Sequence, residues 1–381
     1  MNVAPGDHLA ARLQEPGGQA AGPAAAEEGG PAAILWARRL LRSLALILAI
    51  SLFVLGIELI KEGASGAAML VAEVVDLDSM PNALGFGWLA AYAAMSGSPV
   101  AAVSVAFVAT GVIPKLAGLA MIAGSRLGAS FIVLFLGFIY VLRGHERRSG
   151  LSMGLLSLVV TISTYLPALA LGAWLLSSGA LDGVEFDGGA FLRSFLDMLL
   201  GPVVNALAGW LPGWALMLVG LGVLWTAFWL FDRALPSLDL ESSRFALVSR
   251  LVYRPLVMFL LGATLTLITL SVSLSLSLLV PLSARGYVRS ENAIPYIMGA
   301  NITTFIDTLL ATVLLGSGAA FTVVLTSMLS ISAVSLVILL LFFRHYERAV
   351  LALVQRTTAN NRNLGLFLAA ILVVPLLLLF M

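Results

Sequence analysis

Residues 298–311 read MGANITTFIDTLLA and carry side chains that could bind ions, although the chain around them is almost entirely apolar. Carboxylate, hydroxyl and carbonyl oxygens suit sodium, by analogy with other hard cations. A carboxylate at the centre of a bilayer costs several kcal/mol unless it is paired or faces water. Four polar residues fall within an arc of about 120° on a helix of 3.6 residues per turn. We therefore expect this face to point into the protein; it consists of Asn301, Thr304, Asp307 and Thr308.

The sequence leaves more than one role open for Asp307. It could be a sodium ligand or a protonatable coupling site, or it could form a buried salt bridge. Arg126 is the obvious partner, because no other base lies deep in a predicted span. Arg126 could instead hold two oxygens of an oxyanion at once, since its guanidinium presents a planar fork of donors.

Serines recur in pairs at two further places, Ser96 with Ser98 and Ser271 with Ser273. Their hydroxyls could donate to an oxyanion or supply oxygen ligands to sodium. Ser98 precedes a proline, a pair that is typical of a helix start. The free N–H groups of such a start attract an anion. The alternative is that these serines bond the backbone of their own helix or pack against a neighbour.

The composition of the chain indicates what must position these residues. Of its 381 residues, 60% are hydrophobic and 11% are charged, and the mean hydropathy is +1.03. Soluble domains are near a quarter charged, so these values indicate an integral membrane protein. The net charge of +1 offers no argument for a nucleic-acid partner. The chain has no cysteine, which excludes thiolate metal sites, and it shows no nucleophile–base motif, no P-loop and no HExxH motif.

The apolar segments predict the membrane spans, since a spanning helix needs about 20 mostly apolar residues. The first 33 residues are rich in Gly and Pro and predict a disordered tail. Residues 191–210 are amphipathic, which favours an interfacial position. The apolar segments are 43–60, 84–113, 116–142, 151–177, 213–231, 255–284, 293–315, 319–343 and 364–381.

The loop charges predict the orientation of these segments. Arginines gather before 43–60, after 116–142, on both sides of 255–284 and before 364–381, whereas acidic residues dominate the other loops. The arginine-rich loops belong in the cytoplasm, which places the N-terminus inside and the C-terminus outside. Segments 84–113 and 255–284 then cannot cross. Each is predicted to be a re-entrant hairpin, and the two enter from opposite faces of the membrane.

Opposed hairpins predict an inverted duplication, and the sequence carries traces of one. Sliding the first half onto the second by 175 residues aligns 93–113 with 268–288, and 121–130 with 296–305, without a gap. Apolar segments interrupted by glycine at matching places in two halves point to the binding site of a transporter. The identities include Gly87 and Gly262, Ser96 and Ser271, Ser98 and Ser273, Gly111 and Gly286, and Gly124 and Gly299.

These motifs resemble those of the type II sodium–phosphate cotransporter family. SGSP and SVSL stand where that family has its paired QSSS motifs, and GSRLGAS and GANITTF stand where it has GANIGTT. The resemblance covers roughly 53–142 and 214–315, and it implies sodium and phosphate sites at the hairpin tips and the broken helices. Four of the departures from the pattern fall on key positions: Met95 and Leu270 replace the glutamines, Arg126 replaces an asparagine and Thr303 replaces a glycine.

Together, the patterns predict an all-α polytopic membrane protein with two inverted-topology repeats. Each repeat would contain a re-entrant helical hairpin and a broken transmembrane helix. The expected parts are a cytoplasmic tail (1–33), repeat 1 (34–150, with hairpin 84–113 and broken helix 116–142), a connecting span and external amphipathic segment (151–212), repeat 2 (213–318, with hairpin 255–284 and broken helix 293–315) and C-terminal spans (319–381).

The expected function is that of a secondary active transporter of the cell membrane, a sodium-coupled symporter of inorganic phosphate that works by alternating access. The alternatives are a transporter of another anion or small solute, and a non-transporting scaffold or regulator. No cofactor is expected and sodium is the expected coupling ion; the lipid bilayer is the expected surrounding, and a homo-oligomer is compatible with the sequence. The expected substrate residues are Ser96, Ser98, Ser271, Ser273, Arg126, Asn301, Thr303 and Thr304, and the expected ion-binding residues are Ser98, Ser273, Thr304, Asp307 and Thr308.

Overall fold

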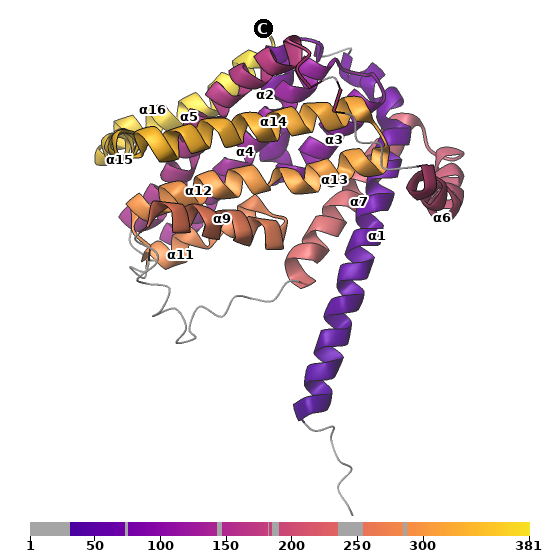
Figure 1. Cartoon of the computed structure of the whole chain (residues 1–381), viewed down its shortest axis with the longest axis horizontal. Helices are drawn as coiled ribbons and strands as arrows, with labels where there is room; N and C mark the ends of the chain where they lie inside the picture. The colour runs from indigo at the N-terminus through magenta and orange to yellow at the C-terminus, as the bar shows by residue number, and fades with distance from the viewer. Residues whose placement is uncertain are drawn as a thin grey trace, which may run out of the picture. The chain divides into compact units, whose positions relative to one another are not determined.

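The computed structural model describes residues 31–72, 75–142, 147–181, 183–184, 190–234, 254–284 and 288–381, and no strand occurs among them. The prediction of an all-α protein is therefore confirmed. Residues Arg42–Met381 form one unit, whose arrangement is described below (Figure 1). Of the predicted tail 1–33, only 31–33 are described, as the start of helix α1 (Pro31–Ala72). The predicted cytoplasmic arginines Arg143, Arg244, Arg250 and Arg285 lie outside the described residues.

Seven helices in the described part of the chain are long and apolar enough to cross a membrane, which makes this a multi-pass membrane protein. They agree in number and order with the predicted spans once the two predicted hairpins are set aside. Helix α6 (Ala190–Ala208), where an interfacial segment was expected, is not among them. The seven are Leu40–Ala67, Lys115–Ile139, Leu151–Ser177, Gly213–Phe231, Ser290–Leu315, Gly318–Ala359 and Asn361–Leu378.

The two segments predicted as hairpins each fold as short helices joined by a tight turn. The first consists of α2 (Met80–Ala94) and α3 (Ser98–Ala109). The second consists of α9 (Pro255–Thr269) followed by α10 (Val272–Ser277) and α11 (Leu279–Ala284). At 1.5 Å per residue, the 15-residue helices α2 and α9 are about 22 Å long. A hydrocarbon core is about 30 Å thick, so neither helix could cross it upright.

Both turns begin with a residue in the left-handed conformation. Met95 has φ 48° and Leu270 has φ 50°, and they are the non-glycine residues with positive φ in the described part of the chain. This conformation costs an L-residue about 1–2 kcal/mol. The two positions are 175 residues apart, the same offset that aligns the serine pairs.

Glycines set the close packing of each short helix on the span that follows it. Helix α2 packs on α4 (Lys115–Leu142), and α9 packs on α12 (Ser290–Thr303). A Cβ atom on any of four glycines would collide with the carbonyl oxygen of a residue in the facing helix. The same contacts recur in both halves at the 175-residue offset: Gly87 with Met121 and Gly262 with Tyr296, then Gly124 with Leu84 and Gly299 with Phe259.

Helix α5 (Arg147–Ser177) packs against α4, α12 and α14 (Gly318–Val337), so it joins the two halves. Helices α12 and α13 (Phe305–Leu315) run beside α14 (Figure 1). Helix α1 packs on α7 (Gly213–Ala234) through small residues, because Gly63 lies against Gly213 and leaves no room for a Cβ. Small residues let helix backbones approach closely in a membrane, where apolar side chains gain little by leaving lipid.

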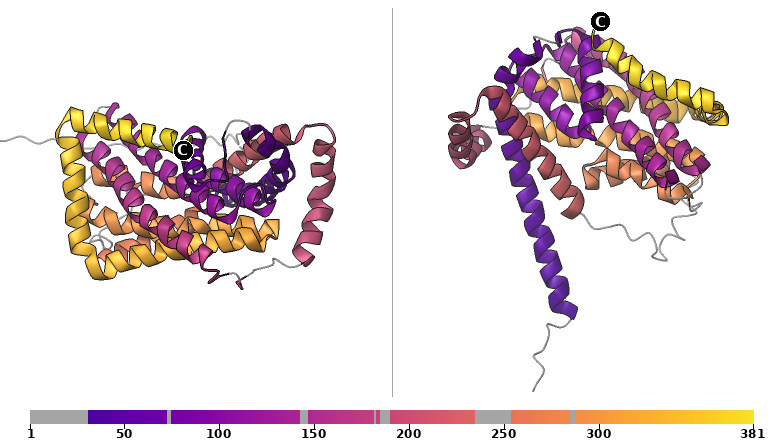
Figure 2. Two further views of the ribbon diagram at one scale, coloured as in Figure 1. Left: turned by 90° about the horizontal axis from the view of Figure 1, so that it is seen from above. Right: turned by 180° about the vertical axis from the view of Figure 1, so that it is seen from behind.

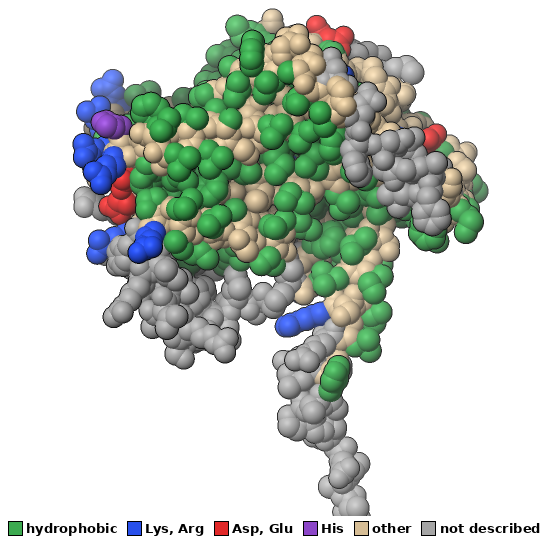
Figure 3. Space-filling view, in the orientation of Figure 1, with side chains coloured by type: hydrophobic (Ala, Val, Ile, Leu, Met, Phe, Trp, Pro, Cys, Tyr) green, Lys and Arg blue, Asp and Glu red, His purple; other side chains and the backbone are tan. Residues whose placement is uncertain are grey.

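The C-terminal helices turn sharply at one end of the unit. A π-helical segment, Ile338–Phe342, ends α14, and α15 (Phe343–Ala359) then runs to the start of α16 (Asn361–Leu378) (Figure 2). Basic side chains gather at this end, whereas the face beside it is mostly hydrophobic (Figure 3). The exposed side chains on α15 include Arg344, His345 and Arg348. Three of the arginines expected in the loop before the last span, Arg344, Arg348 and Arg356, therefore lie on this amphipathic helix, and Arg362 lies at the start of α16.

The prediction that segment 116–142 is a broken helix is wrong, because α4 continues without interruption through Gly124 and Arg126. Gly124 allows the backbone of α2 to pack closely against α4, and the helix does not end there. The predicted break in the second half is found at Thr304, between α12 and α13. Thr303 bonds the Ala263 carbonyl on α9 there. Hydroxyl side chains that bond backbone groups compete with regular helix.

Candidate functional site

Arg126 lies in the middle of α4 and is only 3% exposed. The helix turn around it is held against α2 by Gly124 and Gly128, neither of which has room for a Cβ. A Cβ on Gly97, in the turn between α2 and α3, would likewise lie too close to the Ser125 carbonyl oxygen. The backbone packing therefore fixes where the Arg126 side chain leaves the helix, and it points toward the second half of the molecule.

The guanidinium of Arg126 joins three helices through its hydrogen bonds. Nη1 donates to Ser98 Oγ at 3.4 Å and to Thr304 Oγ1 at 3.2 Å. Nη2 donates to the Thr304 carbonyl oxygen at 3.2 Å and to Thr308 Oγ1 at 2.6 Å. Ser98 is at the start of α3, whereas Thr304 and Thr308 belong to the break and to α13. The predicted residues Ser98, Arg126, Thr304 and Thr308 are thus brought together.

Asp307 completes the cluster as the acid that faces Arg126. Its Oδ1 lies 3.5 Å from Nη2 of Arg126, and it accepts a hydrogen bond of 2.8 Å from Thr308 Oγ1. Asp307 is 5% exposed, so the prediction that it faces the protein interior is confirmed. The salt bridge that the sequence left open as an alternative is present. Breaking such a pair is costly because it leaves one buried charge unpaired.

The cluster also holds two buried polar atoms without a hydrogen-bond partner in the described structure. They are Nε of Arg126 and Oδ2 of Asp307. Buried polar atoms in folded proteins are nearly always paired, and an exception calls for an explanation. Both atoms belong to the charged groups that the sequence predicted as ligands of an anion and of a cation.

Aromatic rings cover one side of the guanidinium. The central carbon of Arg126 lies 5.1 Å from the centroid of the Phe305 ring, within the range of a cation–π interaction. Tyr165 on α5 stacks on Phe305 with centroids 6.3 Å apart. The Tyr165 hydroxyl donates to the Asn301 carbonyl at 2.9 Å, which ties α5 to the turn that precedes the break.

Two of the predicted site residues point away from Arg126. The Asn301 amide donates to Thr161 Oγ1 on α5 at 3.2 Å. Thr303 Oγ1 donates to the Ala263 carbonyl on α9 at 2.9 Å. Both side chains hold the broken helix to its neighbours, and neither bonds Arg126 or Asp307 in the described structure.

The remaining predicted serines lie outside the cluster. Ser271 Oγ accepts the amide of Leu274 at 3.2 Å and so caps α10. Ser96 and Ser273 are half-buried, and no hydrogen bond joins either of them to Arg126 or Asp307 in the described residues. The structure thus shows the local capping alternative for Ser271.

The ends of two helices add to the electrostatics of the cluster. Helix α3 begins at Ser98, with Pro99 in its first turn, and α13 begins at Phe305, with Asp307 in its first turn. The first N–H groups of a helix carry a partial positive charge. The start of α3 therefore lies beside the guanidinium through Ser98, and Asp307 lies in the first turn of α13, where negative charge is favoured.

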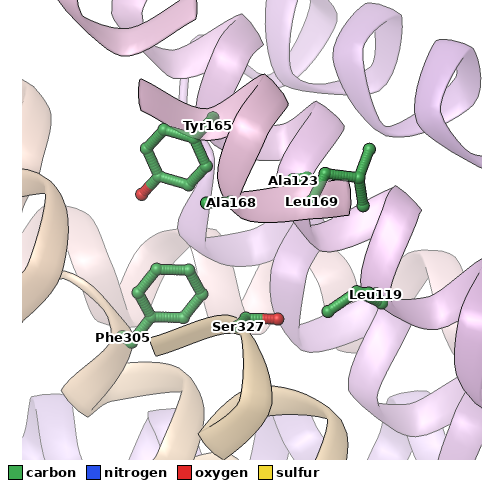
Figure 4. Close-up of a pocket in the computed structure, with 7 residues that line it drawn as sticks. All are labelled: Leu119, Ala123, Tyr165, Ala168, Leu169, Phe305 and Ser327. Carbon is green, nitrogen blue, oxygen red and sulfur yellow. The ribbon is translucent and has the colours of Figure 1, made fainter. Parts of the chain in front are cut away.

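A cavity of about 10 Å³ is lined in part by Phe305, whose ring also contacts the Arg126 guanidinium (Figure 4). This volume is close to that needed for one water molecule. Tyr165 and Phe305 lie across from each other in the view, and Ser327 supplies a hydroxyl (Figure 4). The lining consists of Leu119, Ala123, Tyr165, Ala168, Leu169, Phe305 and Ser327.

Sequence reasoning missed three residues that support the cluster: Thr161, Tyr165 and Phe305. The stretch TISTYLP (161–167) held a usable signal, since it places hydroxyl side chains and a proline in the middle of a predicted span. Phe305 gave no signal, because one aromatic residue in an apolar helix is ordinary.

Comparisons of the chain with protein-family models, with curated proteins and with solved structures found no match. The described residues also include no group of three His, Asp or Glu side chains that could hold a metal ion.

Proposed function

We propose that the chain is a secondary active transporter that couples sodium to the uptake of inorganic phosphate across the cell membrane. The proposal takes its substrate and coupling ion from the resemblance of SGSP, SVSL and GANITTF to the type II sodium–phosphate cotransporter family. It takes its site from the cluster around Arg126. The N-terminus is cytoplasmic and the C-terminus external in this proposal, as the loop arginines predict.

In this proposal the two short-helix segments are re-entrant hairpins that belong to inverted repeats. Three observations support it. The helices are too short to cross a membrane upright, the turns have left-handed Met95 and Leu270 at matching positions, and the glycine contacts recur at the same 175-residue offset. Irregular backbone at this depth is tolerated where protein surrounds it, and Ser98 at the first tip is buried.

The observation that carries the function is the buried guanidinium of Arg126, which reaches from α4 to the start of α3. Its two terminal nitrogens have four oxygen acceptors from Ser98, Thr304 and Thr308. An oxyanion would meet a planar fork of donors, hydroxyl groups and a helix start in one place. Arg126 would supply the donors that the glutamines supply in the family that the chain resembles.

Sodium would bind on the acidic side of the same cluster. Asp307 Oδ2, Thr308 Oγ1 and the Thr304 carbonyl are oxygens of the kind that hard cations prefer. The site would open alternately to the two sides as one repeat moves against the other. The contact between α3 and α13 joins the two repeats at this point, so their relative movement would open the cluster.

Uptake of labelled phosphate into proteoliposomes tests the proposal. We expect uptake that requires an inward sodium gradient and stops when choline replaces sodium. Ser98→Ala should lower uptake at subsaturating phosphate about tenfold, because hydrogen bonds to charged groups contribute about 1.5–3 kcal/mol. Ser277→Ala is the matched control, since Ser277 bonds only the Leu274 carbonyl of its own helix in the described structure, and uptake should not change. Uptake that is independent of sodium would contradict the proposed coupling.

A second candidate is the transport of another oxyanion. Apolar Met95 and Leu270 occupy the two tip positions where the resembled family has amide side chains. Inhibition of phosphate uptake by sulfate at equal concentration would favour this candidate, whereas phosphate uptake unaffected by tenfold excess sulfate would exclude sulfate as the substrate.

A third candidate is a membrane scaffold or regulator that does not transport. The observation that favours it is the closed state of the cluster: Arg126 and Asp307 are paired, and the adjacent cavity has room for about one water molecule. This candidate predicts no flux, and no change in thermal stability on adding phosphate and sodium to the purified protein.

A further inference from the structure

The ion pair between Arg126 and Asp307 is only partly closed. The Nη2–Oδ1 distance is 3.5 Å, whereas charge-assisted hydrogen bonds are near 2.7–2.9 Å. A single carboxylate oxygen faces the guanidinium, and Asp307 Oδ2 and Arg126 Nε have no hydrogen-bond partner in the described structure. Arginine–carboxylate pairs frequently use both carboxylate oxygens in a two-pronged contact. This pair has kept one acceptor and one donor free.

The surroundings make the two charges depend on each other. Both side chains are at least nine-tenths buried, so neither charge is neutralised by bulk water. Removal of one member of a buried pair is strongly destabilising, because the other charge stays unpaired. Thr308 lies between them: its hydroxyl accepts from Arg126 Nη2 and donates to Asp307 Oδ1. No other charged group has an ion pair with either residue in the described residues.

We propose that Arg126 and Asp307 form an exchangeable ion pair, so that the anion and the cation bind only together. An oxyanion takes the place of Asp307 on the guanidinium, and sodium takes the place of Arg126 on the released carboxylate. The inference rests on the transport function proposed above and adds the physical cause of its coupling. Either ligand alone would leave one buried charge without a partner. By linkage, sodium raises the affinity for the anion by the same factor as the anion raises the affinity for sodium.

The test is a set of thermal-unfolding titrations of the purified full chain in detergent, with inorganic phosphate as the anion and choline replacing sodium at constant ionic strength. In the wild type, sodium should lower the apparent Kd for phosphate at least tenfold. Asp307→Asn should bind phosphate with the same Kd in sodium and in choline, because no carboxylate is released. A full sodium dependence in Asp307→Asn would overturn the exchange.

The reciprocal test asks whether sodium binding depends on freeing Asp307 from Arg126, and it is made without phosphate. Arg126→Gln frees Asp307 for a cation, so sodium alone should raise its Tm, whereas sodium alone should leave the wild-type Tm unchanged. The double variant R126Q/D307N should respond to neither ligand. Glu58→Gln is the control, because it removes another largely buried carboxylate that is paired with Lys61, and it should behave as the wild type. Absence of a sodium response in folded Arg126→Gln would overturn the exchange.

Two charge-conserving variants keep the inference testable where a single neutral variant does not fold. Arg126→Lys and Asp307→Glu should keep the mutual dependence, with each affinity weakened by about tenfold. Loss of the sodium dependence in both would count against the exchange. A wild type that fails to respond to phosphate together with sodium overturns the proposed phosphate function itself. A wild type that responds while Asp307→Asn keeps its sodium dependence overturns only the exchange.

Discussion

The two halves of the membrane unit, 80–142 and 255–315, share one arrangement of helices, turns and glycine contacts, called the frame below, but differ in their polar side chains. Helices α2 and α9 have matching bounds at the 175-residue offset, and α4 and α12 begin at matching positions. The turn conformations and the glycine contacts match as well. Close backbone packing therefore sets the frame, and it tolerates many changes in the side chains around it.

The differences between the halves lie at the centre of the molecule. Helix α3 is continuous and buried over 98–108, whereas its counterpart is divided into α10 and α11. Arg126 occupies an unbroken helix, whereas its counterpart Asn301 precedes a break. The first half supplies the cation of the buried pair and the second half supplies the acid. The comparison teaches that the frame is repeated while the charged site is made once, from both halves.

The shared frame can be broken at its glycines, where we expect the largest effect. Gly87→Leu and Gly262→Leu would each drive a side chain into a backbone carbonyl of the facing helix. Overpacking against backbone should cost about 3 kcal/mol or more and prevent recovery of a monodisperse protein on size-exclusion chromatography.

Gly222→Leu on α7 is the matched control for this pair, because a Cβ at Gly222 meets nothing within 4 Å. A protein that tolerates Leu at 262 but not at 87 would show that the two halves are not held by the same contacts.

The asymmetric site can be tested by a double-mutant cycle. Arg126→Gln and Asp307→Asn should each destabilise the protein by about 3–5 kcal/mol, because each leaves one buried charge unpaired. The double variant should recover much of that loss, and the difference measures the coupling between the residues. Chemical denaturation of the three variants in detergent gives the free energies. Strictly additive losses would mean that the pair contributes nothing.

A smaller effect is expected at the aromatic support of the break. Tyr165→Phe leaves the Asn301 carbonyl without its hydroxyl donor, and a buried unpaired acceptor costs about 1–3 kcal/mol. Thermal unfolding should show a lower Tm. Tyr92→Phe provides a comparison. The Tyr92 hydroxyl donates to the Ile371 carbonyl, which has no helical donor because Pro375, four residues on, lacks an N–H group. An unchanged Tm in Tyr165→Phe would show that the break does not need this bond.

The smallest effect is expected at the two turns. Met95→Gly and Leu270→Gly should each stabilise the protein by about 1 kcal/mol, because glycine adopts positive φ without the penalty that other residues pay. Similar gains in the free energy of unfolding at both positions, measured by chemical denaturation, would support the structural similarity of the two halves. A loss at either one would mean that its side chain contributes more packing than its backbone costs.

Much of the frame could be predicted from the sequence, because length and hydropathy decide which helices can span a membrane. The loop charges place both ends of 84–113 on one side of the membrane and both ends of 255–284 on the other, which predicts that neither segment crosses. The burial of Asp307 followed from the cost of a charge in lipid. The inverted arrangement, the sodium and phosphate sites and the transport function stay predictions.

The remainder depended on contacts between distant segments. The sequence predicts a helix break at Gly124, yet in the structure Gly124 lets α2 approach α4 closely, and glycine suits both purposes. The roles of Thr161 and Tyr165 follow from the packing of α5 on α12, which no pattern along the chain reveals. The sequence named Arg126 and Asp307 as possible partners, but only their distance in space shows them paired.

The central claim is that the two hairpins enter the membrane from opposite faces, and labelling of single cysteines tests it most directly. The chain has no cysteine, so each variant carries one thiol. Positions Asp78 and Thr110 flank the first hairpin, and Arg254 and Ser290 flank the second. With an impermeant maleimide on intact cells, cysteines at 78 and 110 should label at once, and those at 254 and 290 only after permeabilisation. Labelling of all four from one face, or of the two ends of one hairpin from opposite faces, would contradict the account.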